Sequence, residues 1–279
     1  MKILDLFLRD LKSAKETFPW LTEEMYNYIK RYNIDKECEL EVFLSYSHKD
    51  KKKAALVKNL LQILGLKAFM AHEDIKPTAE WENFITDELK QCNVFVPILT
   101  KNFYESEWTD QESGAAIIRD MEIIPVSIAP EGEDFEMPRG FVGKYQALQY
   151  RLKEEDLVND DDGYGKSVTL NLNLIVKLVE GIKDKPETIS KVRNCFVKSL
   201  PDSTSFKEAN SRSQLLGSIG PFDETALITF ILGYAFNDQI KNATSASRSI
   251  EKLIENNFNK LDSKAKSIWE VSKKRSKVV

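Results

Sequence analysis

The sequence predicts a parallel α/β domain followed by an all-helical region, and three observations support this prediction. Between residues 38 and 185, apolar stretches of five to seven residues alternate with stretches of ten to fifteen residues that have helical periodicity. The short stretches are apolar at almost every position, as are strands that are covered on both faces of a sheet. Beyond Pro186 the periodicity is helical only. Strands that alternate with helices indicate a parallel sheet with helices on both faces.

The elements of this domain can be taken in chain order. The first apolar stretch, residues 40–46, is predicted to be a strand, and the helix after it, residues 51–64, ends at Gly65. Asp50 directly precedes this helix, so we expect its carboxylate to accept hydrogen bonds from the first turn as an N-cap. The remaining strands are predicted at 67–71, 93–99, 123–128 and, with the weakest pattern, 147–152, and the remaining helices at 81–91, 106–120 and 167–182.

Two helical regions flank the α/β domain, which we place at residues 38–185. Residues 1–37 form a helical N-terminal extension, which is too short to be a domain and must pack on the next domain or on a second chain. Residues 186–279 are predicted to form a helical C-terminal domain for sensing or oligomerisation. Its helices are expected at 189–200, 224–240 and 247–273, with a polar loop at 201–213. The segment 226–236 is apolar nearly all round, which favours a buried core helix over the alternative of an oligomer interface.

Composition excludes several classes of protein. The chain of 279 residues has a formal net charge of -4, which gives no general attraction to nucleic acid or to anionic lipid. Charged residues interrupt the apolar N-terminus, and no apolar run approaches the ~18 residues of a membrane span. The three cysteines have no metal-ligand spacing, and there is no glycine-rich phosphate loop. We therefore expect a cytoplasmic protein that binds no metal and no cofactor, and is neither a dehydrogenase nor a P-loop nucleotidase.

The ligand crevice of a parallel α/β sheet lies beyond the carboxyl ends of the strands. The residues to consider as a site are therefore those that directly follow the first three strands, at 45–50, 72–81 and 100–112. They include tyrosine, tryptophan, serine and acidic side chains.

Four motifs in this region occur in a recognisable order. The first strand runs into a polar turn as FLSYSHKD, and the second, KAFMA, is followed by HEDIKPTAEW. The third strand and the helix after it read NVFVPILTKNFYESEWTDQESGAA, and the fourth strand reads EIIPVSI. Together they resemble the Toll/interleukin-1 receptor (TIR) domain family, in particular its prokaryotic, NAD-cleaving branch. The resemblance implies a flavodoxin-like, five-stranded parallel sheet.

The resemblance implies that Glu112 is the catalytic residue, because it matches the glutamate of the Trp-x-x-x-Glu element of NAD-cleaving TIR domains. Trp108 lies four residues before Glu112 on the predicted helix, so both side chains should lie on one face. Its indole can then line the site and exclude water. The alternative is that Trp108 is a core residue and that Glu112 is solvated.

Four further residues are candidates for substrate binding. Trp81 aligns with an aromatic position that stacks on nicotinamide or its ribose in NAD-cleaving relatives, and its alternative role is packing. Tyr46 and Ser47 lie at the end of the first strand and can contact the ribose or the diphosphate. Asp74 either orients the second loop or is merely solvated.

The chemistry of this reaction needs only one carboxylate. Nicotinamide leaves as a neutral molecule, so no acid has to protonate it, whereas ordinary glycoside hydrolysis uses two carboxyl groups. Positive charge grows on the ribose in the transition state, and one carboxylate can stabilise that charge and accept from a ribose hydroxyl.

The leading hypothesis is therefore an NAD glycohydrolase or cyclase, with NAD as substrate, that releases nicotinamide and either ADP-ribose or a cyclic isomer. The resemblance implies a role in antiviral defence signalling, a homo-oligomer with sites completed between neighbouring TIR domains, and a downstream effector or an infection-derived trigger. Two alternatives remain: a non-enzymatic interaction module, and a nucleoside deoxyribosyltransferase-like enzyme, which also uses a lone glutamate on a parallel α/β scaffold.

Overall fold

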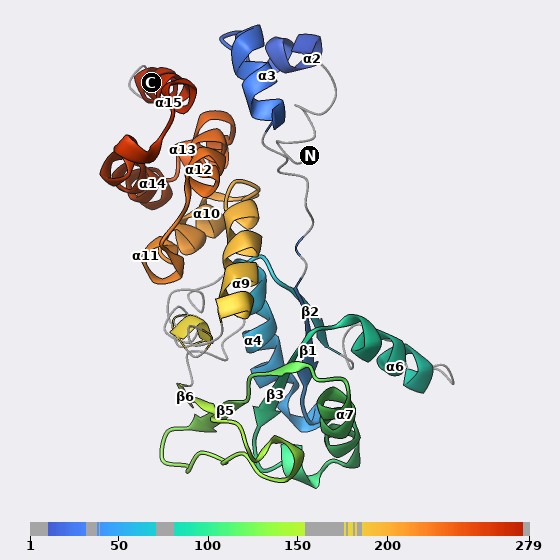
Figure 1. Ribbon diagram of the computed structural model, residues 1–279. Coiled ribbons are helices and arrows are strands. Elements are labelled where there is room, and N and C mark those ends of the chain that lie inside the picture. The colour runs from blue at the N-terminus through green and yellow to red at the C-terminus, as the bar shows by residue number, and fades with distance from the viewer. Residues whose placement is uncertain are drawn as a thin grey trace. The chain divides into compact units, whose positions relative to one another are not determined.

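The computed structural model describes residues 11–31, 38, 40–70, 81–153, 176, 178–180, 182 and 186–275 (Figure 1). The chain forms two compact units, Cys38–Val192 and the combination of Met1–Glu37 with Arg193–Val279. Within the described ranges, no helix is both long enough and apolar enough to cross a membrane.

The first unit, Cys38–Val192, is built on a parallel sheet, as predicted. Its strands are β1 (Glu41–Ser45), β2 (Lys67–Met70), β3 (Val94–Leu99), β4 (Glu122–Ile123), β5 (Val126–Pro130) and β6 (Leu148–Leu152). They pair in the order β2-β1-β3-β5-β6, and β4 also pairs with β3 on the β5 side. Strands β4 and β5 follow one another along the same side of β3 and together fill one strand position in the sheet. The break between them lies next to Pro125, which has no amide hydrogen to donate to a neighbouring strand. The sheet therefore has the five strand positions and the strand order of a flavodoxin-like fold.

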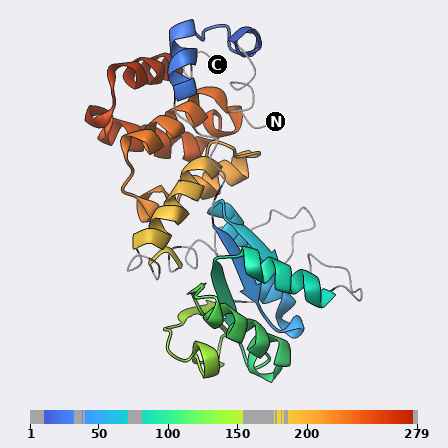
Figure 2. The ribbon, with the colours of Figure 1, turned by 45° about the vertical axis from the view of Figure 1, so that its right-hand side comes forward.

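Three helices of this unit follow the predicted pattern. They are α4 (Lys51–Ile63), α6 (Trp81–Gln91) and α7 (Glu107–Ile118). Helix α6 lies beside α7 (Figure 2), and both contribute to one apolar cluster with Phe43 of β1 and Phe95 of β3. Helix α4 connects β1 to β2, and α6 connects β2 to β3 on the other side of β1. Because these two connections run in opposite directions along the sheet and both are right-handed, α4 lies on the face opposite to α6 and α7. It ends as predicted, because Gly65 has a positive φ of 79°.

The structure tests only part of the prediction for the C-terminal end of the α/β domain. The helix expected at 167–182 lies largely outside the described residues, as do residues 1–10 of the N-terminal extension. Three short 3-10 helices complete the described part of this unit, namely η1 (His48–Asp50), η2 (Phe103–Glu105) and η3 (Gly140–Val142).

The second unit consists of helices, as expected. They are α2 (Leu11–Thr17), α3 (Glu23–Arg31), α9 (Pro186–Ser199), which begins in the first unit, α10 (Phe206–Ser213), α11 (Leu216–Ile219), α12 (Glu224–Phe236), α13 (Asp238–Lys241), α14 (Thr244–Asn256), the 3-10 helix η5 (Phe258–Lys260) and α15 (Ser263–Arg275). The predicted helices at 224–240 and 247–273 are each divided in two, at Asn237 and around residues 257–262.

The prediction of a loop at 201–213 is wrong, because α10 occupies its second half. The helix starts at Ser205, whose hydroxyl accepts a hydrogen bond from the Glu208 amide at 3.2 Å. Glu208 in turn accepts from the Thr204 amide at 2.6 Å. Ser205 is thus an N-cap that satisfies an amide group of the first turn, and Glu208 binds the amide of the residue before the cap. The serine-rich composition of the segment concealed this N-cap.

Helix α12 is the core of the second unit, as predicted for the apolar segment 226–236. Every residue from Ala226 to Tyr234 is buried. The N-terminal extension packs on this core within the same chain, because Trp20 stacks on Phe236 with ring centroids 4.9 Å apart. Tyr28 of α3 also donates a hydrogen bond to Asp262 at 2.8 Å.

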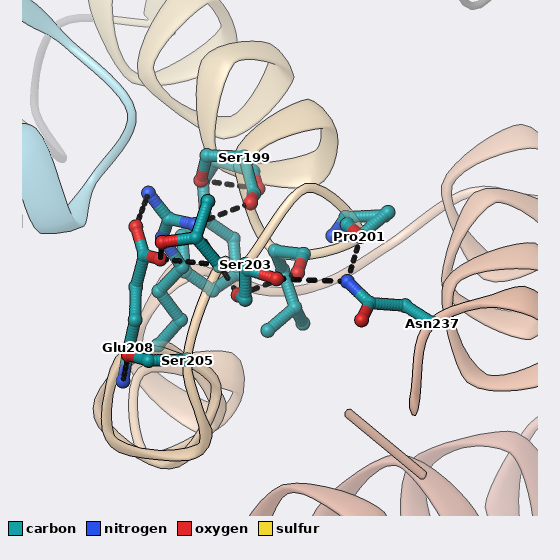
Figure 3. Close-up of polar contacts among 10 residues, drawn as sticks. Ser199, Pro201, Ser203, Ser205, Glu208 and Asn237 are labelled. Carbon is teal, nitrogen blue, oxygen red and sulfur yellow. Dashed lines mark hydrogen bonds and ion pairs between the residues drawn. The ribbon is translucent and has the colours of Figure 1, made fainter. Parts of the chain in front are cut away.

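A polar network fixes the turn between α9 and α10 (Figure 3). The Asn237 side chain points toward this turn and donates to the carbonyl oxygens of Pro201 and Ser203 at 2.7 and 2.9 Å. Arg212 donates to the Ser199 carbonyl at 2.6 Å and forms an ion pair with Glu208 at 2.7 Å. Buried backbone carbonyls thus receive side-chain donors, which avoids the cost of leaving them without partners.

This arrangement predicts that Gly233→Ala destabilises the second unit. A Cβ atom at Gly233 would lie 2.9 Å from Cβ and 3.0 Å from Cα of Pro201, closer than packed atoms can lie. We expect overpacking to cost about 1–3 kcal/mol, so over most of this range it outweighs the gain of about 1 kcal/mol from replacing glycine in a helix. Thermal unfolding measures the effect. The control is Gly217→Ala, where a Cβ would meet nothing within 4 Å. An equal response of the two variants would contradict the packing argument.

Candidate active site

Buried polar residues of the first unit are concentrated near one edge of its sheet. They come from the end of β1, the turn after it, the residue after β3, helix α7 and β5. Their names are Ser45, Ser47, Asp50, Thr100, Thr109, Glu112, Ser113 and Ser127. Strand β1 lies between β2 and β3, so the chain leaves the ends of β1 and β3 in opposite directions. This reversal of strand order is where parallel α/β proteins bind ligands.

Glu112 is the buried carboxyl group at this edge. It lies in the second turn of α7, and its Oε2 atom accepts a hydrogen bond from the Ser45 hydroxyl at 2.5 Å. Only 9% of the residue is exposed. Burial raises the pKa of Glu112 to about 8, although the hydrogen bond from Ser45 acts in the opposite direction. At neutral pH the ligand-free site therefore holds Glu112 mainly as the neutral acid.

Asp50 is a second buried carboxyl group nearby, and its predicted role as an N-cap is wrong. Its side chain makes no capping hydrogen bond to α4. It accepts instead from Thr100 at 2.6 Å, from Asn102 at 3.0 Å and from Lys53 at 2.7 Å. Thr100 and Asn102 join the turn after β1 to the turn after β3, whereas Lys53 lies in α4 itself. The Asp50 carboxylate therefore accepts from side chains and not from the backbone amide groups in the first turn of α4.

The same contacts determine the charge of Asp50. Burial by itself would raise the pKa of this carboxyl group, but the hydrogen bonds from Lys53, Thr100 and Asn102 outweigh burial and hold the pKa below its ordinary value. Asp50 is thus a permanent anion at neutral pH, in contrast to Glu112.

The predicted substrate-binding residues differ in how the structure places them. Tyr46 and Ser47 follow β1 as expected, but each is only 3% exposed. Trp108 lies one helical turn before Glu112 and is 37% exposed, so it borders the surface while Glu112 faces the sheet. Trp81 is the first residue of α6. Asp74 lies outside the described residues.

Sequence reasoning missed the residues that hold the two carboxyl groups. Ser45, Thr100 and Asn102 lie in the ranges predicted to form the site, at 45–50 and 100–112, but no role was predicted for any of them, and Lys53 lies outside these ranges. One signal was present: Ser45 and Thr100 are polar residues in or directly after strands that are otherwise apolar, and buried polar groups need hydrogen-bond partners. The sequence does not identify which partner each of them finds.

Comparison with known proteins identifies the family of the first unit. The family model described as TIR domain matches residues 42–163, a range that includes β2 to β6, all of β1 except Glu41, and both Ser45 and Glu112. This match confirms the resemblance carried by the four motifs, while the prokaryotic, NAD-cleaving branch stays a prediction. A search of curated proteins gave no match.

The buried state of Glu112 predicts a pH-dependent contribution to stability. Its pKa rises from 4.5 for the free side chain to about 8 in the fold, so the folded protein binds a proton that the unfolded chain releases between these values. The stability associated with the protonated side chain is fully present below about pH 4.5 and is lost as the pH rises through about 8. As the pH rises through this window, the free energy of unfolding of the wild type should fall relative to that of Glu112→Gln by up to about 1.4 kcal/mol per pH unit.

Urea unfolding of both proteins between pH 4.5 and 9 measures this difference, since the other carboxyl groups titrate equally in the two. Glu105→Gln is the control, because Glu105 is exposed on η2 near the same edge. A difference between wild type and Glu112→Gln that does not vary with pH would show that Glu112 is ionised in the folded protein.

Proposed function

Residues 42–163 of this chain belong to the TIR domain family, and on this premise we propose that the chain is an enzyme that breaks the bond between nicotinamide and ribose in NAD. The observation that carries the proposal is the buried Glu112 carboxyl group beside the end of β1, held by Ser45 at 2.5 Å. Among the described residues of the first unit it is the buried glutamate, and it lies at the sheet edge where such folds bind ligands; the reaction needs one carboxylate.

The substrate itself would convert Glu112 to its active form. The nicotinamide ring of NAD carries a positive charge, and a positive charge within a few ångströms lowers the pKa of a carboxyl group. A pKa of about 8 in the free site is close enough to neutrality for this effect to ionise Glu112 on binding. The resulting carboxylate would stabilise the positive charge that grows on the ribose as nicotinamide leaves.

Water or a nucleophile on the adenine side then attacks the ribose, so the product is ADP-ribose or a cyclic isomer. We further propose that the reaction serves antiviral defence, by depleting NAD or by producing a nucleotide signal for a downstream effector. Neighbouring TIR domains in a homo-oligomer would complete the site.

A second function, that of a non-enzymatic interaction module, is favoured by one observation. Four large apolar side chains of the TIR domain are exposed around α7 and the segment before and within η3: Trp108, Ile118, Met137 and Phe141. Exposed apolar side chains that lie close together are typical of surfaces that bind other proteins, and helix α7 is in contact with η3. An interaction module would leave NAD intact in every assembly state.

The proposed function predicts that Glu112→Gln abolishes NAD cleavage. Glutamine keeps the shape of the side chain but cannot carry negative charge, so the rate should fall about 10²–10³-fold, as it does when one electrostatic contact to a transition state is removed. Release of nicotinamide from NAD, followed by chromatography over a range of protein concentrations, measures the rate.

Glu105→Gln is again the matched control and should retain the wild-type rate. Undiminished cleavage by Glu112→Gln would remove the carboxylate from the mechanism. Intact NAD in the presence of the wild type, at all concentrations at which it assembles, would instead support the interaction module.

A further inference from the structure

Ser45 is an unusual residue for its position. It is the last residue of β1, on the same face of the strand as Phe43, which packs in the apolar cluster under α6 and α7. The next side chain on that face would be expected to be apolar as well, but Ser45 is polar and fully buried. Burying a hydroxyl group is unfavourable unless it forms a hydrogen bond. Its hydroxyl group donates a hydrogen bond to Oε2 of Glu112.

The backbone of Ser45 is held firmly by the sheet. It pairs in register with Pro97 of β3, and its neighbour Leu44 pairs with both Met70 of β2 and Val96 of β3. A central strand with partners on both sides is among the most rigid positions in a fold. The hydroxyl of Ser45 is therefore a fixed reference point from which the side chain of Glu112, on the neighbouring helix, can be oriented.

The two oxygens of Glu112 have different surroundings. Oε2 accepts the hydrogen bond from Ser45, whereas Oε1 accepts none from the described residues. A hydrogen bond to one oxygen fixes the rotation of the carboxyl group and thereby determines the direction of the other.

We propose that Ser45 is a positioning residue for Glu112, whose hydroxyl holds Oε2 so that Oε1 faces the ribose of the bound nucleotide. This inference rests on the proposed function, since that function supplies the ribose. Ser45 does not itself touch the reacting atoms.

Ser45 also controls how readily Glu112 ionises. A hydroxyl that donates to a carboxylate favours the charged form, and this contact is what opposes the effect of burial on the pKa of Glu112. Removing the hydroxyl should raise that pKa further above about 8.

Other charges do not account for the pKa of Glu112. Helix α7 packs against β1, β3, α6, η2 and η3. The described titratable side chains on these elements and on α7 itself are Glu41, Asp87, Glu88, Lys90, Tyr104, Glu105, Glu107 and Asp110. None of them contributes to the shift, whose causes are burial and the hydrogen bond from Ser45.

The test compares Ser45→Ala with Ser113→Ala in the full-length protein. Ser113 is also buried and directly follows Glu112, but its hydroxyl donates to the Thr109 carbonyl at 2.6 Å and not to Glu112. Both changes remove one buried hydroxyl group, so any general effect on folding is shared. Ser45→Cys is a second variant of nearly the same shape whose thiol is a weak donor, and Ser45→Thr restores a hydroxyl.

Two measurements are made on each variant. The first is kcat and KM for NAD cleavage as a function of pH. Because a hydrogen bond to a charged carboxylate favours its ionised form, Ser45→Ala and Ser45→Cys should move the acidic limb of the kcat/KM profile to higher pH by about one pH unit or more. At pH 7, kcat should fall about tenfold with a smaller change in KM. Ser45→Thr should recover the rate, and Ser113→Ala should keep the wild-type pH profile.

The second measurement needs no activity. The ionisation of Glu112 is followed in the ligand-free protein by carbon-13 NMR of labelled glutamate carboxyl groups, with Glu112→Gln used to assign the signal. The pKa of Glu112 should rise in Ser45→Ala and Ser45→Cys and should not change in Ser113→Ala.

The two measurements separate failure of this inference from failure of the proposed function. Unchanged pH profiles and an unchanged Glu112 titration in both Ser45 variants would overturn the role of Ser45 while NAD cleavage stands. A wild-type protein that leaves NAD intact would overturn the proposed function and the ribose assignment with it. The titration would then still decide whether Ser45 controls the ionisation of Glu112.

Discussion

Burial of polar groups at the carboxyl edge of the parallel sheet is the constraint on which the candidate site depends. Strands β1 and β3 are apolar and covered on both faces, so water does not reach the polar residues that end them. Those residues must pair with one another, and they do so across elements: Ser45 with Glu112, and Thr100 with Asp50. The hydrogen bonds of the site are thus the same bonds that make burial of these residues tolerable.

The two carboxyl groups at this edge have pKa values shifted in opposite directions by their donors. Asp50 has three donors, one of them the cation of Lys53, and stays ionised. Among the described residues Glu112 has one donor, the neutral hydroxyl of Ser45, which does not offset burial. Different surroundings of this kind give two acids different tasks. Asp50 holds the turns after β1 and β3 together, and Glu112 is the group whose charge a ligand can change.

Sequence periodicity was sufficient to predict the fold, because it depends on which faces of the elements are buried. It predicted the bounds of α6 and the alternation of strands and helices, whereas the flavodoxin-like sheet was implied by the resemblance to TIR domains. Contacts between residues distant in the chain were not predictable. Asp50 was expected to cap α4 because that role is local, but its partner Thr100 is 50 residues away. Ser45 was overlooked because its partner Glu112 is 67 residues away. Where a local signal existed, as in the N-cap Ser205 before α10, the prediction of a loop from the serine-rich composition obscured it.

A glutamate that rests as a neutral acid has a consequence for selectivity that a permanently charged one would lack. An ionised carboxylate in a buried site attracts cations in general, whereas a neutral acid has no net charge to attract them. For Glu112 to ionise, a ligand must bring positive charge close to the carboxyl group and hold it there. If the proposed function holds, the pyridinium and the developing positive charge on the ribose meet this requirement. After nicotinamide has left and the ribose has been captured, the positive charge is gone, and the same burial that raises the pKa of Glu112 returns it to the neutral acid.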